Sequence, residues 1–299
     1  MKVLVAGITG FVGRELLPVL LAAGHQVVGV SRKPAVNTLG VPVLQCDIAA
    51  GGDLARALDG IDVAYYLVHS IEQHNAEGFA VRDRRAAELF GRAAERASVR
   101  RIVYCGVSPA AGSTTPTAHR HSRSEVGSIL QSAVPESVCL RTWTILSPTN
   151  QFIRFLIYLL RQQRLVALPP SARFRSPPID GRDLALALAA AAHTPELAGR
   201  TVDVVGKTVI NNVELVEGLS DKLGLRRRIV RLPFRPPKQL LTGLIRAARL
   251  DATLVQTALS SAEVGDVLPE QNFLEALVPS PHGLDASLAY AVGSNGSGV

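Results

Sequence analysis

The sequence predicts an α/β fold in which a doubly wound parallel sheet is followed by a smaller, mainly helical region. Short apolar segments alternate with amphipathic segments through the first half of the 299 residues, as in successive β-α-β units. Apolar residues make up 47% of the chain and charged residues 19%. This composition can bury a large core and excludes disorder over most of the length.

Each strand expected in the first half is a short apolar segment bounded by turn residues. The fourth segment is apolar on both faces, which is typical of a buried central strand. The six expected strands are Lys2–Ala6, Gln26–Val30, Val41–Cys46, Val63–His69, Arg101–Gly106 and Val138–Leu146.

The helices expected between these strands have apolar residues every three or four positions. The first, Phe11–Ala23, ends at Gly24 and contains Pro18, which removes one backbone donor and predicts a slight kink. The second, Glu77–Ala97, has arginine and glutamate on one side and alanine and leucine on the other. The third, Ser122–Ser132, follows a loop that includes residues 119–121.

In the second half of the chain the sequence pattern changes, and most of the expected elements are helices. One further strand, Thr201–Val205, is expected to return to the sheet, and 169–178 is expected to be a loop rich in proline and arginine. A short strand is expected where the arginine cluster Arg226–Arg228 with Arg231 follows a helix. The expected helices are Gln151–Arg164, Asp180–His193, Val213–Leu223, Pro237–Leu250 and Asp251–Ala262.

Charge and cysteine usage narrow the class of protein. The net charge of +7 comes almost wholly from arginine and is spread along the chain, and its densest cluster, Arg226–Arg228 with Arg231, fits a solvated turn. We therefore expect no nucleic-acid partner. The three cysteines all lie in strand-like segments, which fits a reducing, cytoplasmic location. No secretion signal is evident in Met1–Gly13, and the longest apolar run, Leu184–Ala192, is too short to span a bilayer, so no membrane role is expected.

The first strand runs directly into a glycine-rich turn that opens a helix. Residues without a Cβ allow a tight turn and a close approach of the backbone to a pyrophosphate, and the helix N-terminus offers its N–H groups to the anion. The strand before the glycines and the helix after them indicate a dinucleotide site and a Rossmann-type fold. The residues expected to contact the cofactor here are Gly7, Thr9, Gly10, Phe11, Val12 and Gly13.

The end of the second strand favours NADP(H) over NAD. An acidic residue there would bind the ribose 2′-hydroxyl of NAD, but the chain has Ser31, Arg32 and Lys33, which suit a 2′-phosphate. Asp47, followed by Ile48, is placed either to accept a hydrogen bond from the adenine amino group or to cap the next turn. We therefore predict an NADP(H)-binding domain at 1–150, a substrate-binding or lid region at 151–292, and a flexible tail at 293–299.

Several motifs together resemble the atypical short-chain dehydrogenases/reductases, the NmrA-like NAD(P)H-binding proteins. The resemblance covers nearly the whole chain and implies that the segment around Leu146 runs past the nicotinamide. His69 then either faces the cofactor or lies in the interior. The motifs are Gly7-x-x-Gly10-x-x-Gly13, Asp47-Ile48, Tyr65-Tyr66-Leu67-Val68-His69-Ser70, the strand 101–106, and the segments 178–183 and 199–206.

One departure from that superfamily bears on the chemistry. Its enzymes typically use a Tyr-x-x-x-Lys pair with a serine, and the tyrosine protonates the alkoxide. None of the five tyrosines here has a lysine four residues later. Laid on the family pattern, the helix 122–132 puts His119 at the tyrosine position and Arg123 at the lysine position, and Ser108 follows the fifth strand.

Two functions of different classes follow. The first is an NADPH-dependent ketoreductase whose proton comes from water, from His119 or from the substrate itself, as in an aromatic polyketide of the angucyclinone kind with a hydroxyl bonded to its ketone. The second is a non-catalytic NADP(H)-binding sensor or assembly protein of the NmrA-like kind. An isomerase or epimerase is a third, weaker option. Neither the oligomeric state nor a lid or interface role for residues 237–262 follows from the sequence.

Overall fold

A parallel sheet of seven strands forms the centre of the computed structural model, which describes residues 1–32, 40–69, 76–108, 117–261 and 265–293. Every neighbouring pair in this sheet is parallel. The strands, in spatial order, are β11 (Thr201–Asp203), β6 (Val138–Thr142), β5 (Arg101–Val107), β4 (Val63–Tyr66), β1 (Lys2–Ala6), β2 (Gln26–Ser31) and β3 (Val43–Gln45). The order changes direction beside β1, which places the carboxyl ends of β1 and β4 at a topological switch point.

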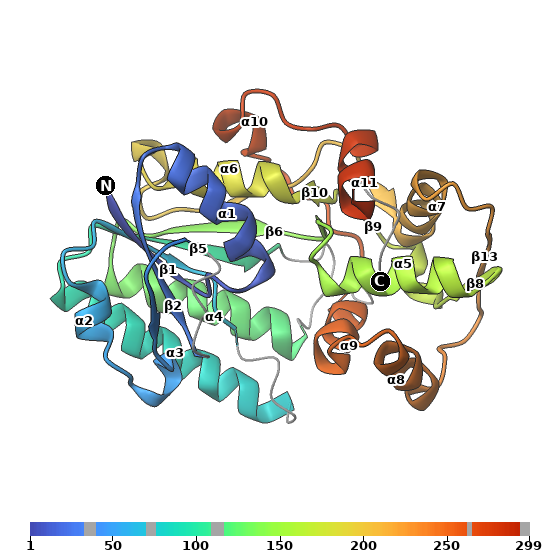
Figure 1. Ribbon diagram of the computed structural model, residues 1–299, viewed down its shortest axis with the longest axis horizontal. Coiled ribbons are helices and arrows are strands. Elements are labelled where there is room, and N and C mark those ends of the chain that lie inside the picture. The colour runs from blue at the N-terminus through green and yellow to red at the C-terminus, as the bar shows by residue number, and fades with distance from the viewer. Residues whose placement is uncertain (33–39, 70–75, 109–116, 262–264, 294–299) are drawn as a thin grey trace.

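Helices cover both faces of the sheet, so the sheet domain is a three-layer α/β/α sandwich (Figure 1). On one face, α1 (Phe11–Ala22) and α6 (Gly181–Ala191) pack on side chains such as Val5 and Val103. On the other, α2 (Leu54–Leu58), α3 (Ala76–Arg96) and α4 (Ala118–Ala133) bury a second apolar layer. The predicted fold class is confirmed.

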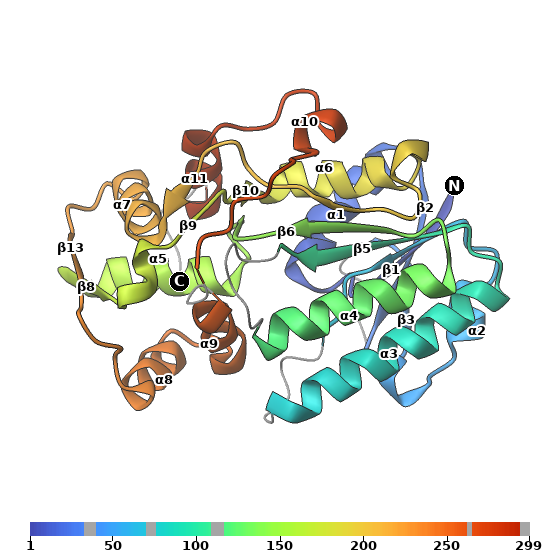
Figure 2. The same cartoon turned by 180° about the vertical axis from the view of Figure 1, so that it is seen from behind.

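The second region is built on a third apolar core, centred on the strongly amphipathic helix α5 (Gln151–Gln162). Figure 2 shows this region beside the carboxyl ends of the central strands. Its other helices are α7 (Asn212–Lys222), α8 (Lys238–Ala247), α9 (Ala252–Ser261) and α11 (Leu284–Val292). Its strand pairs are β7 (Ile145–Leu146) with β10 (Ile179–Asp180), β8 (Leu165–Leu168) with β13 (Arg228–Arg231), and β9 (Arg175–Ser176) with β12 (Ile210–Asn211). The short helix α10 (Leu274–Leu277) instead packs against α6 in the core of the sheet domain.

Three sequence predictions need correction. The segment 169–178 is not a loop throughout, because it contains a 3₁₀ helix at Pro170–Arg173 and the strand β9, which pairs with β12. The strand expected over 138–146 divides, because the chain leaves the central sheet after Thr142 and Ile145–Leu146 pairs with β10 instead. The third helix begins at Ala118 rather than Ser122, because the Thr117 hydroxyl oxygen accepts a hydrogen bond from the Arg120 amide at 3.3 Å and so caps the helix. His119 and His121 therefore lie in a helix and not in the expected loop. The predicted return of a strand at 201–205 to the sheet is confirmed as β11, which pairs with β6.

The helix α11 is anchored to the first helix of the sheet domain through one carboxylate. The Tyr290 hydroxyl donates to Glu15 Oε2 at 2.7 Å, and the Ser147 hydroxyl donates to Glu15 Oε1 at 2.6 Å. The Arg182 guanidinium lies 4.2 Å from the centre of the Tyr290 ring. Burial and the Glu15 carboxylate raise the pKa of Tyr290, so the phenol remains a donor at physiological pH. Glu15 thus joins α1, the segment after β7, and α11.

We expect Tyr290→Phe to lower the free energy of unfolding by about 1–2 kcal/mol, because a hydrogen bond to a charged acceptor is lost. Urea unfolding of Tyr290→Phe, Glu15→Gln and the double variant measures the coupling between the two side chains. Strictly additive effects would show that this hydrogen bond contributes nothing to stability. Tyr158→Phe, on α5, is the matched control, since its hydroxyl makes no hydrogen bond within the described residues.

Candidate functional site

The glycine turn after β1 has the shape that a bound pyrophosphate requires. Gly7 has a φ of +88°, and a Cβ on it would come within 2.9 Å of the Leu67 carbonyl oxygen. A Cβ on Gly13 would lie 2.6 Å from the Gly7 carbonyl oxygen and 2.7 Å from Ile8 Cα. Gly10 precedes α1 and supplies no side-chain cap, so the N–H groups of the first helical turn remain available to an anion. The turn therefore fits a dinucleotide phosphate.

A cavity of about 310 Å³ adjoins this turn at the carboxyl ends of β1, β2 and β4. The residues predicted to bind the cofactor that line it are Gly7, Thr9, Gly10, Ser31, Arg32, Asp47, Ile48 and His69. Phe11, Val12 and Gly13 form the first turn of α1 beside it, and Leu146 is fully buried in β7 in contact with the third core. Lys33 lies outside the described residues. Their contacts with a cofactor remain predictions.

Two groups in this cavity bear on how a nucleotide would be held. Ser31 is the last residue of β2, and its hydroxyl lies 3.5 Å from the Thr9 hydroxyl, beside the glycine turn. Asp47 caps the short helix at 48–50 by accepting from the Ala49 amide at 3.1 Å, and its other oxygen accepts from Arg82 at 2.5 Å. The capping role weighed for Asp47 is therefore real, and each carboxylate oxygen retains a lone pair for a further donor. Arg82, on α3, was not found from the sequence because nothing in its helical pattern separates it from the solvated arginines nearby.

His69 and His119 lie in the same electrostatic environment near the ends of β4 and β5. Burial, together with the smaller effects of Arg123, His119 and Arg32, lowers the pKa of His69 to about 3. Burial, Arg123 and Arg120 likewise lower the pKa of His119 to about 3. The His69 Nδ1 atom is buried and has no hydrogen-bond partner among the described residues, which marks it as a group that a ligand can satisfy. Both imidazoles are neutral at physiological pH, which weakens the role of His119 as a proton donor.

These shifts predict an acid-sensitive fold. In the unfolded chain each histidine binds a proton below its ordinary pKa of 6.5, whereas in the folded chain it does so only near 3. The stability that the two neutral histidines provide is therefore fully present above pH 6.5 and is lost as the pH falls toward 3. For each histidine, the equilibrium constant for unfolding rises by up to about tenfold per pH unit. Urea unfolding at several pH values tests this. The pH dependence should shrink in His69→Asn and His119→Gln, and persist in His121→Gln, an exposed position on the same helix.

Arg123 connects the ends of two neighbouring strands. Its guanidinium donates to the Val68 carbonyl at 3.3 Å and to the Cys105 carbonyl, and it lies 4.7 Å from the centre of the Tyr104 ring. Its side chain is buried, with 7% of the residue exposed. These bonds use two of the five N–H groups. The side chain at the predicted lysine position therefore holds the backbone that borders the nucleotide cavity, and it has donors left for a ligand.

Ser108 is held by a buried carboxylate. Its hydroxyl donates to Asp203 Oδ1 at 2.8 Å, and Asp203 also accepts two bonds from Arg141, at 2.9 and 2.6 Å. Because the serine proton is directed to Asp203, Ser108 is placed to accept from a substrate hydroxyl rather than to donate to a carbonyl. The sequence did not single out Asp203, because its role depends on β11 returning to the sheet beside β6.

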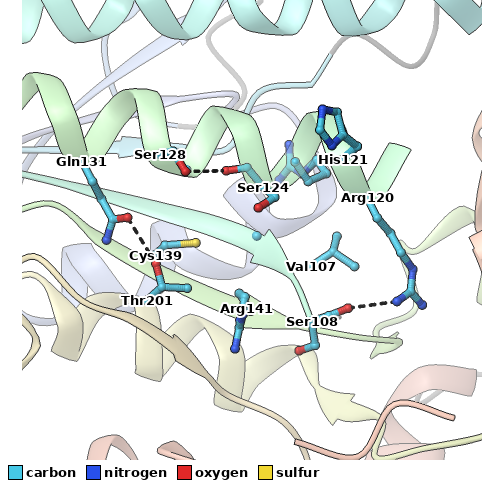
Figure 3. A pocket seen from close by; sticks show the side chains of 13 residues that line it. Val107, Ser108, Arg120, His121, Ser124, Ser128, Gln131, Cys139, Arg141 and Thr201 are labelled. Atoms are coloured by element: carbon cyan, nitrogen blue, oxygen red, sulfur yellow. Dashed lines mark hydrogen bonds between the residues drawn. The ribbon is translucent and has the colours of Figure 1, made fainter. Parts of the chain in front are cut away.

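A second cavity, of about 320 Å³, lies between α4 and the strands β5, β6 and β11. Figure 3 shows Arg120 extending from α4 toward the Ser108 carbonyl, to which it donates at 3.3 Å, with Arg141 on the strand side. The Arg120 guanidinium also lies 4.1 Å from the centre of the Trp143 ring. Burial lowers the pKa of Arg120 to about 10, so it remains charged at neutral pH. Ser108 and Arg123 both line this cavity, whereas His119 does not.

The tyrosines do not replace the missing acid. Burial raises the pKa of Tyr65, Tyr66 and Tyr104, and the Tyr104 hydroxyl donates to the Arg123 carbonyl at 3.0 Å. Tyr290 is bound to Glu15, and Tyr158 packs on the third core. No tyrosine hydroxyl within the described ranges therefore lies at the position next to Ser108 that the family pattern assigns to the acid.

A family model described as NAD(P)H-binding matches residues 7–195, which span the glycine turn and the whole nucleotide cavity. The chain belongs to the NAD(P)H-binding family. The expectation of a dinucleotide site is thereby confirmed at the level of NAD(P)H. No helix in the described part of this family member is both long and apolar enough to cross a membrane.

Among curated proteins, a 3β-hydroxysteroid dehydrogenase/Δ5→4-isomerase of Mycobacterium tuberculosis is 35% identical over 114 residues. This match covers 34% of the chain and only 30% of that enzyme, so it spans less than a third of the relative.

Solved structures resemble the chain over nearly its whole length. Pal from Bacillus thuringiensis has a TM-score of 0.76 at 15% identity and covers 97% of both chains. The Citrobacter sp. triphenylmethane reductase complexed with NADP(H) has a TM-score of 0.75 at 18% identity, covering 97% of this chain and 100% of the other. The UDP-glucuronic acid 4-epimerase of Bacillus cereus, in complex with UDP-glucuronic acid and NAD, has a TM-score of 0.74 at 16% identity, covering 97% and 99%. At these identities the likeness establishes the fold alone.

Proposed function

We propose that the protein is an NADPH-dependent ketoreductase of the atypical short-chain dehydrogenase/reductase type that takes the proton from its own substrate. The observation that carries this proposal is the chemistry beside Ser108. Ser108 directs its proton to Asp203, and Arg120 and Arg123, which line the same cavity, remain protonated. His119, the residue at the family's acid position, is neutral and does not line this cavity. A site that binds and orients without its own acid suits a substrate that carries one.

The nucleotide is assigned as NADP(H) from the end of β2. Ser31 lines the cavity with its hydroxyl near Thr9, and Arg32 lines the same cavity, which supports the proposal that both bind a 2′-phosphate. The N–H groups of the first turn of α1 would hold the pyrophosphate. His69 Nδ1, which has no hydrogen-bond partner among the described residues, would bond to the cofactor. When bound, NADPH supplies a hydride. Arg123 fixes the backbone at Val68 and Cys105, which determines where a ligand can lie.

The substrate is proposed as an aromatic ketone with a phenolic hydroxyl bonded internally to the carbonyl oxygen. As the carbonyl carbon accepts a hydride, its oxygen takes the proton of that hydroxyl, and water then reprotonates the phenolate. Arg120 provides a fixed positive charge near the developing negative charge. Polycyclic polyketides of the angucyclinone kind have this arrangement, and the sequence resembles the angucyclinone ketoreductase of simocyclinone biosynthesis.

The test follows NADPH oxidation with pairs of ketones that differ only in the neighbouring hydroxyl. We expect the hydroxylated ketone to be reduced faster by about 10²–10⁴-fold, the usual contribution of a placed acid. Equal rates for both ketones would refute the internal proton. Tight NADPH binding without turnover on any ketone would favour the sensor or assembly protein, which has the same nucleotide site.

NADPH should bind more tightly than NADH, and Ser31→Asp should reverse that order.

A further inference from the structure

A long stretch of the second region carries positive charge only. Residues 222–250 contain nine lysines and arginines and no aspartate or glutamate, although the net charge of the whole chain is only +7. The same is true of residues 137–179, which contain six arginines and no acidic residue. The second stretch includes β8, and the first includes its partner β13, so the pairing of these strands brings the two stretches together.

This charge lies at one end of the molecule. Figures 1 and 2 both place β8, β13 and the chain between β13 and α8 at the end farthest from the N-terminus. Four of the arginines here are exposed and form no ion pair with any described residue. We call this surface, together with the loop 232–237 and the start of α8, the basic end; the four arginines are Arg164, Arg226, Arg228 and Arg231.

Apolar side chains are exposed among these charges. Phe234 is 60% exposed, Leu240 is 58% exposed and Leu165 is 49% exposed. Leu165 pairs with Arg228 in the register of β8 and β13, so an apolar and a basic side chain stand next to each other. Phe234 lies between Pro233 and Arg235 in the exposed loop. Basic and large apolar side chains are therefore exposed together on β8, β13, the loop 232–237 and the start of α8.

We propose that the basic end binds the surface of a membrane that contains anionic phospholipids. Arginine and lysine side chains are attracted to anionic headgroups, and exposed phenylalanine and leucine enter the boundary between headgroups and acyl chains. A nucleic acid would pair its backbone with the arginines but would leave the exposed aliphatic side chains of Leu165 and Leu240 without a role. This inference concerns attachment to a surface, and it does not depend on the proposed reaction.

The test is cosedimentation of the full-length protein with vesicles of phosphatidylcholine, with or without phosphatidylglycerol. We expect binding only to the anionic vesicles, and weaker binding as salt is added. Arg226→Glu, Arg228→Glu and Arg231→Glu combined should lower the partition coefficient by at least about a hundredfold, since each cation near such a surface contributes roughly a fivefold factor. Absence of binding to anionic vesicles at low salt would overturn the proposal.

The matched control reverses three exposed arginines outside the basic end, Arg56, Arg85 and Arg96, and gives the same net charge. It should change the partition coefficient by only a few-fold. An equal loss in both triple variants would mean attraction by overall charge and would refute a defined surface. NADPH binding and urea unfolding confirm that each variant is folded.

Insertion of the apolar groups is tested at Phe234. The three native cysteines are all buried, so Phe234→Cys offers one exposed thiol for an environment-sensitive dye. Its emission should shift to shorter wavelength with anionic vesicles and stay unchanged with neutral ones. An unchanged emission while the protein cosediments would exclude insertion at this position and leave a purely electrostatic contact, contrary to the proposal.

Discussion

Gly13→Val is expected to weaken NADPH binding by at least about 100-fold, because the new side chain has no space in the glycine turn. A Cβ at this position would lie 2.6 Å from the Gly7 carbonyl oxygen and 2.7 Å from both Ile8 Cα and the Ile8 carbonyl oxygen. All three are backbone atoms of the turn itself, so the turn must move away from the shape that fits a pyrophosphate. Isothermal titration with NADPH measures the effect.

The control for this substitution is Gly243→Ala on α8. A Cβ at Gly243 would meet no atom within 4 Å. Alanine in a helix is favoured over glycine by about 0.5–1 kcal/mol, so this variant should be equally or more stable and bind NADPH unchanged. Urea unfolding separates loss of binding from loss of the fold. Wild-type affinity in a folded Gly13→Val protein would contradict the assignment of the turn to the nucleotide.

Arg123→Met is expected to lower the free energy of unfolding by about 2–5 kcal/mol, because it leaves buried carbonyl oxygens without a donor. The Arg123 guanidinium bonds to the carbonyls of Val68 and Cys105, which end neighbouring strands, and it lies against the Tyr104 ring. NADPH affinity should fall with stability, since Val68 lines the nucleotide cavity. Urea unfolding and nucleotide titration on the same samples measure both effects.

Arg123→Lys separates charge from geometry. A lysine keeps the positive charge, but a single ammonium group cannot reproduce the fork that bonds two carbonyls. We therefore expect stability and NADPH affinity between those of the wild type and Arg123→Met. If Arg123→Met unfolds at the wild-type urea concentration, the two carbonyl bonds do not hold the site together.

The fold class could be predicted because its signals are local. The first strand, the glycine turn and the first helix follow one another in the chain, and their pattern alone predicts the cavity beside Gly7. The helix boundary at Ala118 could not be placed so well. It depends on one hydrogen bond from the Arg120 amide to the Thr117 side chain, whereas the residues that follow, His119-Arg120-His121, suggested a polar loop.

The sequence could predict where the candidate residues lie on strands and helices, but not which side chains they contact; their roles stay predictions. Ser108, Arg123 and Asp47 were each selected from their position after a strand or on a helix. Their partners come from elements far away in the sequence: Asp203 lies 95 residues after Ser108, and Arg82 lies 35 residues after Asp47. Such pairings depend on the spatial order of the strands and the packing of α3, which side-chain periodicity does not encode.

The hydrogen bond between Tyr290 and Glu15 affects the order in which the parts of the fold are completed during synthesis. Its two residues are 275 positions apart, and Glu15 lies on the helix that opens the phosphate turn. As the chain leaves the ribosome, the sheet around that turn can form early. Glu15 and Ser147 then stay hydrated until Tyr290 has been translated. The nucleotide half is therefore complete only after almost three hundred residues have been translated. Fragments that end before Tyr290 would leave Glu15 without this donor and the α11-binding surface exposed to water.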